Sequence, residues 1–433
     1  MKYFDERYIL YGKLENSSGV LGDCRCEINT NEIDLEAWSA TVSVFQGSQV
    51  ALTKSMTDPN GITFISNGPN EEVRVKGARP SVSYGSYNDE ILKFDINELY
   101  IKKRHKEGIP DKLSLTYYIP AVLLYEKRNM VSHHYRKGYL NGWQGWKKEI
   151  EGVNIQDEWI NEQNVIPSPV GTLKISPVFL FKDIDIDGVK TTIIVNQLII
   201  ESEIDNPSTS LDAAKIEIEK TIEDYMTTLS LLEADKIDWY YCRGYTSNQG
   251  TLEEIQYYKR SIKRMNPAYY APRYRLHSDT LKKIHIDLTN CLISKSDNER
   301  AVINKIIERF IIASRVPAVD TKLIYWHSCL DVLIKECKGE GRSYNHKVID
   351  ACIKIGVEWL DIYPEMTITS LEQKAEFPFN RIRNKMIHDG EHPDDYSEVF
   401  SELPRIKALC ERIITKIIGV DYKNTGFGMV EKF

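Results

Sequence analysis

No stretch of this chain is apolar for the roughly 18 residues that a membrane-spanning helix needs. The first residues, Met1 to Arg7, also lack the long apolar segment of a secretory signal peptide. Apolar residues make up 42% and charged residues 27% of the 433 residues, which is typical of a soluble globular protein with two or three domains. We therefore expect no membrane segment and a cytoplasmic location.

Cysteine is scarce as well. The 8 cysteines are spread thinly along the chain, so they do not indicate a disulfide framework. Cys24 and Cys26 would share one face of a strand, but no second Cys/His pair follows at the spacing of a zinc site. The sequence therefore predicts neither a metal centre nor another cofactor.

An excess of positive charge is also absent, because the formal net charge is −7. A nucleic acid would have to bind through a local basic patch. The segment from Ile255 to Ser278 contains no acidic residue and interleaves basic side chains with tyrosines. Its basic residues are Lys259, Arg260, Lys263, Arg264, Arg273 and Arg275. Basic groups neutralise phosphates and aromatic faces stack on bases, so this segment is a candidate RNA contact; a solvated linker is the alternative.

Residues 1–205 contain short runs of β-branched and aromatic residues between Gly, Asn and Pro turns, which predict a β-rich domain. The clearest hairpin runs from Val178 to Ile204 and turns at Asp187-Gly188. The residues from Asp183 to Gly188, which include this turn, match the first half of an EF-hand calcium-binding loop. Ile194, however, stands at the twelfth position, where a bidentate glutamate belongs. We therefore expect a hairpin there and not a calcium site.

Helical patterns dominate after residue 205. Residues 206–276 predict a helical connector, with a helix from about Leu211 to Glu233 and a short strand from Ile237 to Tyr245 ahead of the basic segment, and residues 277–433 predict a helical bundle. The predicted helices of the bundle are Asn298–Ser314, Asp320–Glu336, Lys347–Leu360, a short segment after Pro378, and a last helix from Val399 to Ile417 that Pro404 interrupts. The expected fold class is α+β, a β-rich N-terminal domain followed by an all-α bundle.

Arg383, Asn384 and His388 stand just before the last predicted helix, and Gly390 closes their segment. Arginine offers a planar, permanently charged fork for phosphate oxygens, and histidine transfers protons near neutral pH. Together they supply the charge stabilisation and the proton shuttle that metal-free cleavage of an RNA phosphodiester needs. An arginine and a histidine at this spacing also occur by chance on solvated helix surfaces.

The spacing of this pair sets a geometric condition. On an ideal α-helix, side chains five positions apart differ by about 140° around the axis and by about 7.5 Å along it. Arg383 and His388 therefore converge only if the helix distorts near its C-terminus, or if a second chain supplies the other half of the site.

The Arg-Asn-x-x-x-His segment, the paired helices before it and a closing helix that ends near Gly419 resemble the HEPN ribonuclease family over residues 280–420. The stretch Leu330-Asp331-Val332-Leu333 resembles the Apea-like branch of that family, which carries an acid in a Leu-acid-x-Leu stretch. Over residues 1–270 the likeness is one of architecture alone, a β-rich region ahead of the helical domain.

This resemblance implies a homodimer whose two motifs face one cleft, cleavage of RNA without a metal, and abortive-infection defence against phage. His388 would act as base on the ribose 2′-OH or as acid on the leaving 5′-oxygen. Arg383 would stabilise charge on the non-bridging oxygens, and Asn384 would hold the phosphate or the arginine. The products would be a 2′,3′-cyclic phosphate and a 5′-OH, with transfer RNA as one candidate substrate.

Two supporting residues and one regulatory role belong to the same hypothesis. Asp331 would orient His388 or Arg383; alternatively it makes an ordinary salt bridge or pairs with His327, one turn away. Arg381 would contact phosphate, although its position also suits a surface salt bridge. The N-terminal domain would sense a phage-derived trigger.

Two other functions remain open. The helical domain could bind a nucleotide or a partner protein without catalysis. The chain could also be a toxin that an antitoxin holds inactive.

Overall fold

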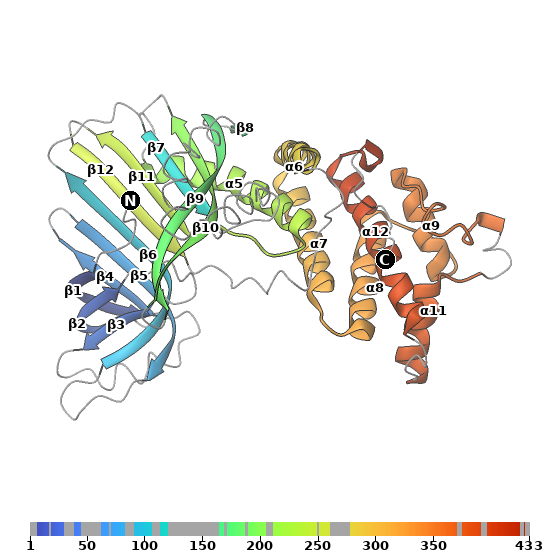
Figure 1. Ribbon diagram of the computed structural model, residues 1–433, viewed down its shortest axis with the longest axis horizontal. Coiled ribbons are helices and arrows are strands. Elements are labelled where there is room, and N and C mark those ends of the chain that lie inside the picture. The colour runs from blue at the N-terminus through green and yellow to red at the C-terminus, as the bar shows by residue number, and fades with distance from the viewer. Residues whose placement is uncertain are drawn as a thin grey trace. The chain divides into compact units, whose positions relative to one another are not determined.

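The structure of the chain is a computed structural model (Figure 1). It describes residues 7–16, 19–29, 39–44, 62–68, 71–82, 91–105, 113–119, 164–168, 171–186, 189–204, 211–248, 251–259, 278–369, 375–390, 396–424 and 428.

The described residues fall into two compact units, one built from strands and the other from helices (Figure 1). The β unit comprises Met1–Val122, Glu126–Lys220 and Asp238–Lys263, and the helical unit comprises Leu123–Tyr125, Thr221–Ile237 and Arg264–Phe433. Helix α5, Leu211–Glu233, contributes its residues up to Lys220 to the β unit and the others to the helical unit. The expected α+β class is therefore confirmed.

The described strands form one antiparallel sheet of 12 strands in the order β3-β2-β1-β4-β5-β6-β12-β11-β7-β10-β9-β8. They are β1 (Arg7–Asn16), β2 (Gly19–Asn29), β3 (Ser39–Val44), β4 (Ile62–Asn67), β5 (Glu71–Val82), β6 (Ile91–His105), β7 (Leu113–Ile119), β8 (Asn164–Ser168), β9 (Gly171–Ile186), β10 (Val189–Ile204), β11 (Tyr241–Asn248) and β12 (Thr251–Lys259). β3 pairs with β2 and also with the first half of β6, so β1 to β6 close into a ring. Alternation along β5 and β6 buries Val73, Val75, Leu99 and Ile101 on one face.

The predicted hairpin is confirmed by the pairing of β9 with β10, in which Ile186 lies opposite Val189. Asp183 and Asp185 are strand residues of β9. The turn residues Asp187 and Gly188 lie outside the described residues.

The strand expected from Ile237 to Tyr245 is present in part as β11, but a second strand, β12, replaces the start of the expected basic segment. Both strands lie in the sheet between β6 and β7 and not in a helical connector. Ile255 and Cys242 are fully buried there, and Tyr257 donates a hydrogen bond to Glu98 of β6 at 2.8 Å. Burial of these side chains against strands far away in the sequence overrides the helical context on either side.

The helical unit contains the helices that the periodicity predicts and one more, α6, for which no bounds were predicted. They are the second part of α5, α6 (Ser278–Ile293), α7 (Asp297–Arg315), α8 (Val319–Glu336), α9 (Tyr344–Ile355), α11 (Pro378–Asn384) and α12 (Ser397–Ile418), with a short 3₁₀ turn, η4, at Tyr422–Asn424. None of the described helices combines the length and the hydropathy that crossing a bilayer requires.

Two of these helices differ from the expected bounds for local reasons. α9 begins three residues earlier than predicted because Ser343 caps it, accepting a hydrogen bond from the backbone N–H of His346. It ends at Gly356, whose φ of 70° is left-handed. α12 continues through Pro404, where the lost hydrogen bond would have gone to the carbonyl of Phe400, an exposed residue that water can reach.

Candidate functional site

The Arg/His segment lies where α11 ends. Pro378 occupies the first turn of α11, where its missing N–H costs nothing. After Asn384 the backbone widens into a π-helical turn, η3, Lys385–Asp389. The N–H of Gly390 closes this turn on the carbonyl of Lys385, with Gly390 at a φ of 67°. Such turns carry an extra residue and occur frequently at functional sites.

The π-helical turn brings the two predicted catalytic side chains together within one chain. Arg383 Nη1 lies 3.4 Å from His388 Nε2. In an α-helix, residues five apart point in different directions, whereas in a π-helix the hydrogen bond joins residue i to i+5. Of the two routes to convergence, the structure therefore contains the helix distortion.

The contact also assigns hydrogen-bonding roles. A guanidinium carries only donors, so this contact is a hydrogen bond in the tautomer whose Nε2 accepts. His388 is exposed and Arg383 is half-buried. The site therefore presents an imidazole and an arginine together at the surface of the helical unit.

Asn384 bridges the arginine and a glutamate. Its Oδ1 accepts from Arg383 Nη1 at 3.0 Å, and its Nδ2 donates to Glu376 Oε1 at 3.1 Å. Within the described part of the chain, both hydrogen-bond contacts of Arg383 use Nη1, and Nη2 has no partner there. Arg383 thus keeps donors that an anionic oxygen could use.

Asp331 contacts neither Arg383 nor His388 among the described residues. Its Oδ2 lies 3.4 Å from Nδ1 of His327, the partner that the sequence offered as an alternative. The buried His327 ring stacks on Tyr344 with ring centroids 4.5 Å apart. Burial, followed by the charge of Asp331, raises the pKa of Tyr344 well above its usual value. Tyr344 therefore stays a neutral phenol beside the site.

The tentative RNA-contact residues are only partly placed. Arg381 forms an ion pair with Glu398 on α12, the salt bridge that its position also allowed. Lys259 is at the end of β12, 2.7 Å from Asp238, with its ammonium over the Trp239 ring. The other five basic residues, Arg260, Lys263, Arg264, Arg273 and Arg275, lie outside the described residues.

The sequence analysis missed two polar residues of the site, Glu376 and Asn380. Asn380 Nδ2 donates to Glu376 Oε1 at 2.5 Å, and Asn380 Oδ1 lies 3.1 Å from His327 Nε2. Glu376, Asn380 and Asn384 are each four positions apart, which places them on one side of α11 and its N-terminal extension. That spacing of polar residues, four positions apart and ending at Asn384, is the signal that could have identified them.

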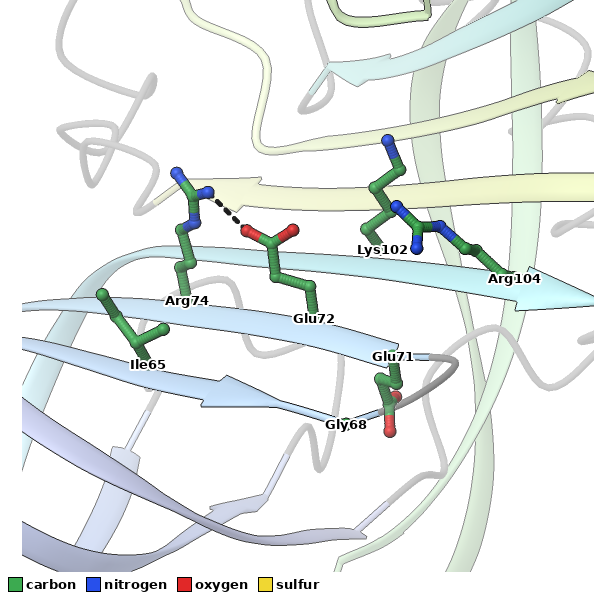
Figure 2. Close-up of a pocket in the computed structure, with 7 residues that line it drawn as sticks. All are labelled: Ile65, Gly68, Glu71, Glu72, Arg74, Lys102 and Arg104. Carbon is green, nitrogen blue, oxygen red and sulfur yellow. Dashed lines mark ion pairs between the residues drawn. The ribbon is translucent and has the colours of Figure 1, made fainter. Parts of the chain in front are cut away.

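Two hollows of about 430 Å³ each are lined by described residues of the β unit. Figure 2 shows one of them, where Arg74 pairs with Glu72 at 2.5 Å. Lys102 and Arg104, which also line it, both pair with Glu253 at 3.2 Å. Because these cations are matched by carboxylates, the hollow has no unpaired charge that would select a ligand.

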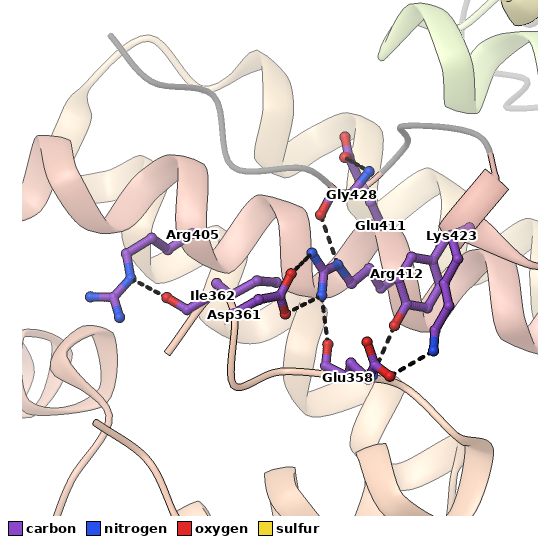
Figure 3. Close-up of polar contacts among 9 residues, drawn as sticks. Glu358, Asp361, Ile362, Arg405, Glu411, Arg412, Lys423 and Gly428 are labelled. Atoms are coloured by element: carbon purple, nitrogen blue, oxygen red, sulfur yellow. Dashed lines mark hydrogen bonds and ion pairs between the residues drawn. The ribbon is translucent and has the colours of Figure 1, made fainter. Parts of the chain in front are cut away.

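A second arginine of the helical unit, Arg412, is the centre of a group of polar contacts (Figure 3). Arg412 is buried and makes two hydrogen bonds of 2.6 Å to the carboxylate of Asp361. It also donates to the carbonyls of Glu358 and Gly428, at 2.7 and 2.8 Å, and lies over the Tyr422 ring. All of its nitrogens have partners, so Arg412 connects α12 to the chain segments around it.

Comparisons with models of protein families, with curated proteins and with solved structures found no match for this chain. A functional assignment therefore rests on the residues and the geometry of the chain itself.

Proposed function

We propose that the chain is a metal-independent endoribonuclease of the HEPN type, which leaves 2′,3′-cyclic phosphate and 5′-OH ends. One observation supports this proposal above the others. The π-helical turn holds the Arg383 guanidinium 3.4 Å from the His388 imidazole, with Asn384 on the same guanidinium nitrogen. An arginine, an amide and an accepting imidazole form a set that suits phosphodiester transfer.

The proposed reaction begins at His388. Its Nε2 takes the proton of a ribose 2′-OH, and the 2′-oxygen attacks the adjacent phosphorus. The bond from phosphorus to the 5′-oxygen then breaks, which leaves a cyclic phosphate on one fragment. Negative charge grows on the non-bridging oxygens, and the spare donors of Arg383 stabilise it. The Asn384 amide holds the arginine in the orientation for this contact.

The leaving 5′-oxygen needs a proton. In the proposed homodimer, a second copy of the chain brings a second His388 to the same phosphate, so one imidazole acts as base and the other as acid. Abortive-infection defence, with the β unit sensing a phage-derived trigger, remains part of this proposal on the family resemblance alone.

The test compares purified wild type with His388→Ala on end-labelled RNA, with and without EDTA. We expect His388→Ala to lower the cleavage rate by about 10²–10⁴-fold, the usual contribution of a positioned acid or base. EDTA should change nothing, and RNA with 2′-deoxyribose at the cut site should survive. His346→Ala is the matched control, because His346 is another histidine of the helical unit, half-buried and paired with Ser343.

Other outcomes would point elsewhere. Cleavage that persists in His388→Ala, or that requires a divalent metal, rejects the proposal. RNA or nucleotide binding without cleavage by wild type favours a non-catalytic binding module. A small protein that co-purifies with the chain and suppresses cleavage favours a toxin and its antitoxin.

A further inference from the structure

An unbroken series of polar contacts passes through the helical unit to the Arg/His site. It starts with the exposed Asp331 and the buried His327 on α8, 3.4 Å apart. His327 then meets Asn380 of α11 at 3.1 Å, and Asn380 donates to Glu376 at 2.5 Å. Glu376 accepts from Asn384, Asn384 accepts from Arg383, and Arg383 faces His388. Each polar group in this series has its partner in the next one.

The donors and acceptors in this series follow one order. A carboxylate only accepts, so Glu376 must receive the N–H groups of both asparagines. The amide oxygen of Asn384 is thereby turned to Arg383, whose guanidinium only donates. The amide oxygen of Asn380 is likewise turned to His327 Nε2, which must carry the hydrogen. The accepting Oε1 of Glu376 therefore sets the direction of both amides.

The two buried members of the series, Asn380 and His327, are held in place by the residues around them. Asn380 and His327 have exposed fractions of only 6% and 5%. The His327 ring is held between Tyr344, stacked at 4.5 Å, and the edge of Phe379 at 6.0 Å. Asn380 therefore cannot turn toward solvent without leaving buried polar groups unpaired.

We propose that Glu376 is a positioning residue, which fixes the Asn384 amide so that its oxygen orients the Arg383 guanidinium toward His388. This inference rests on the proposed ribonuclease function for its kinetic consequence, although the geometry exists without it. A flipped amide would turn an N–H toward Arg383 and push the guanidinium away from the imidazole. The reacting groups would then be displaced, and displacements of about 1 Å can cost up to about 10²-fold in rate.

The first experiment separates positioning from stability. We expect Glu376→Ala to lower kcat by about 10–100-fold while KM stays within about 3-fold, at a temperature where the variant is folded. Glu376→Gln should retain most of kcat, because its carbonyl oxygen can still accept from both asparagines. Glu358→Ala is the matched control, since the Glu358 carboxylate pairs with Lys423 away from the site. A kcat of Glu376→Ala equal to that of the control would overturn the proposal.

The second experiment reverses the polarity of one hydrogen bond. Asn384→Asp alone puts two carboxylates face to face and should be strongly impaired. Combined with Glu376→Gln, the introduced amide can donate to the introduced carboxylate, which still accepts from Arg383. We expect the double variant to cut faster than Asn384→Asp alone. Strict additivity in this double-mutant cycle would show that the two residues do not act through each other.

A third measurement does not depend on activity. The ¹⁵N spectrum of labelled histidines distinguishes protonated from unprotonated ring nitrogens, and the resonance of His388 is assigned by its loss in His388→Gln. Glu376→Ala should change the His388 Nε2 signal, and Glu358→Ala should not. An unchanged signal rejects the positioning role even if RNA is cleaved. A changed signal in a chain that cuts no RNA supports the positioning role and rejects the ribonuclease function.

Discussion

Arg383 and Arg412 belong to the same helical unit but differ in how their donors are used. Arg412 is buried, and carboxylate and carbonyl oxygens meet all three of its nitrogens (Figure 3). Arg383 is half-buried, and its described contacts use Nη1 alone. A guanidinium with every donor matched stabilises the fold, whereas one with spare donors beside an accepting imidazole can bind an incoming anion.

The same contrast applies to the hollow of the β unit. Three basic residues and two glutamates line it, yet Arg74, Lys102 and Arg104 each have a carboxylate within 3.2 Å. Local positive charge is thus a weaker guide to function than unmatched donors. The following predictions test this distinction.

The largest effect is expected at Arg383. Arg383→Ala removes the donors proposed to stabilise the transition state, which should lower kcat by about 10²–10³-fold with little change in melting temperature. Arg383→Lys keeps the charge but loses the planar fork, so it should recover only part of the rate. Single-turnover cleavage and thermal melting check both. If Arg383→Ala instead lowers the melting temperature while the folded variant cleaves at the wild-type rate, Arg383 has the same structural role as Arg412.

Arg412 should show the opposite behaviour. Arg412→Met keeps the aliphatic part of the side chain but leaves the carbonyls of Glu358 and Gly428 without their donor. We expect the free energy of unfolding to fall by about 3 kcal/mol, because hydrogen bonds to a buried charged donor are lost and their acceptors are left unpaired. Urea unfolding measures this loss, and the cleavage rate of the folded variant should stay within about 3-fold of wild type. A large loss of rate in the folded variant would contradict a purely structural role.

The buried His285 extends the comparison to pH. Burial lowers the pKa of His285 to about 4, and its Nε2 lies 3.1 Å from the carbonyl of Tyr225. Below a pH of about 6.5 the unfolded chain binds a proton that the folded chain refuses. The contribution of His285 is thus full above pH 6.5 and falls by up to about 3 kcal/mol as the pH drops to about 4.

Urea unfolding between pH 4 and 7, for wild type and His285→Gln, isolates this contribution. The difference in unfolding free energy between the two proteins should shrink as the pH falls. A difference that is constant over this range would show that His285 does not stay neutral in the folded chain.

The smallest effect is expected at Lys259. Its ammonium is already engaged by Asp238 at 2.7 Å and by the Trp239 ring at 4.0 Å. Lys259→Met should therefore cost no more than about 1 kcal/mol of stability and should leave RNA affinity within about 2-fold. Fluorescence anisotropy with labelled RNA checks the affinity. A marked loss of RNA affinity would show that Lys259 contacts RNA.

The sequence by itself determined what depends on near neighbours. α5 begins at Leu211 and ends at Glu233 as its apolar spacing predicts, because a stripe at steps of three and four is buried only in a helix. Gly390 was predicted to close the Arg/His segment, and its φ of 67° is a conformation that glycine adopts without strain.

Tertiary structure decided what depends on distant partners. The place of β11 and β12 between β6 and β7, and the contact of His327 with Asn380, 53 residues away, follow no local periodicity. Each arises because a buried polar group or an apolar strand face must find a partner, and that partner is supplied by another part of the folded chain.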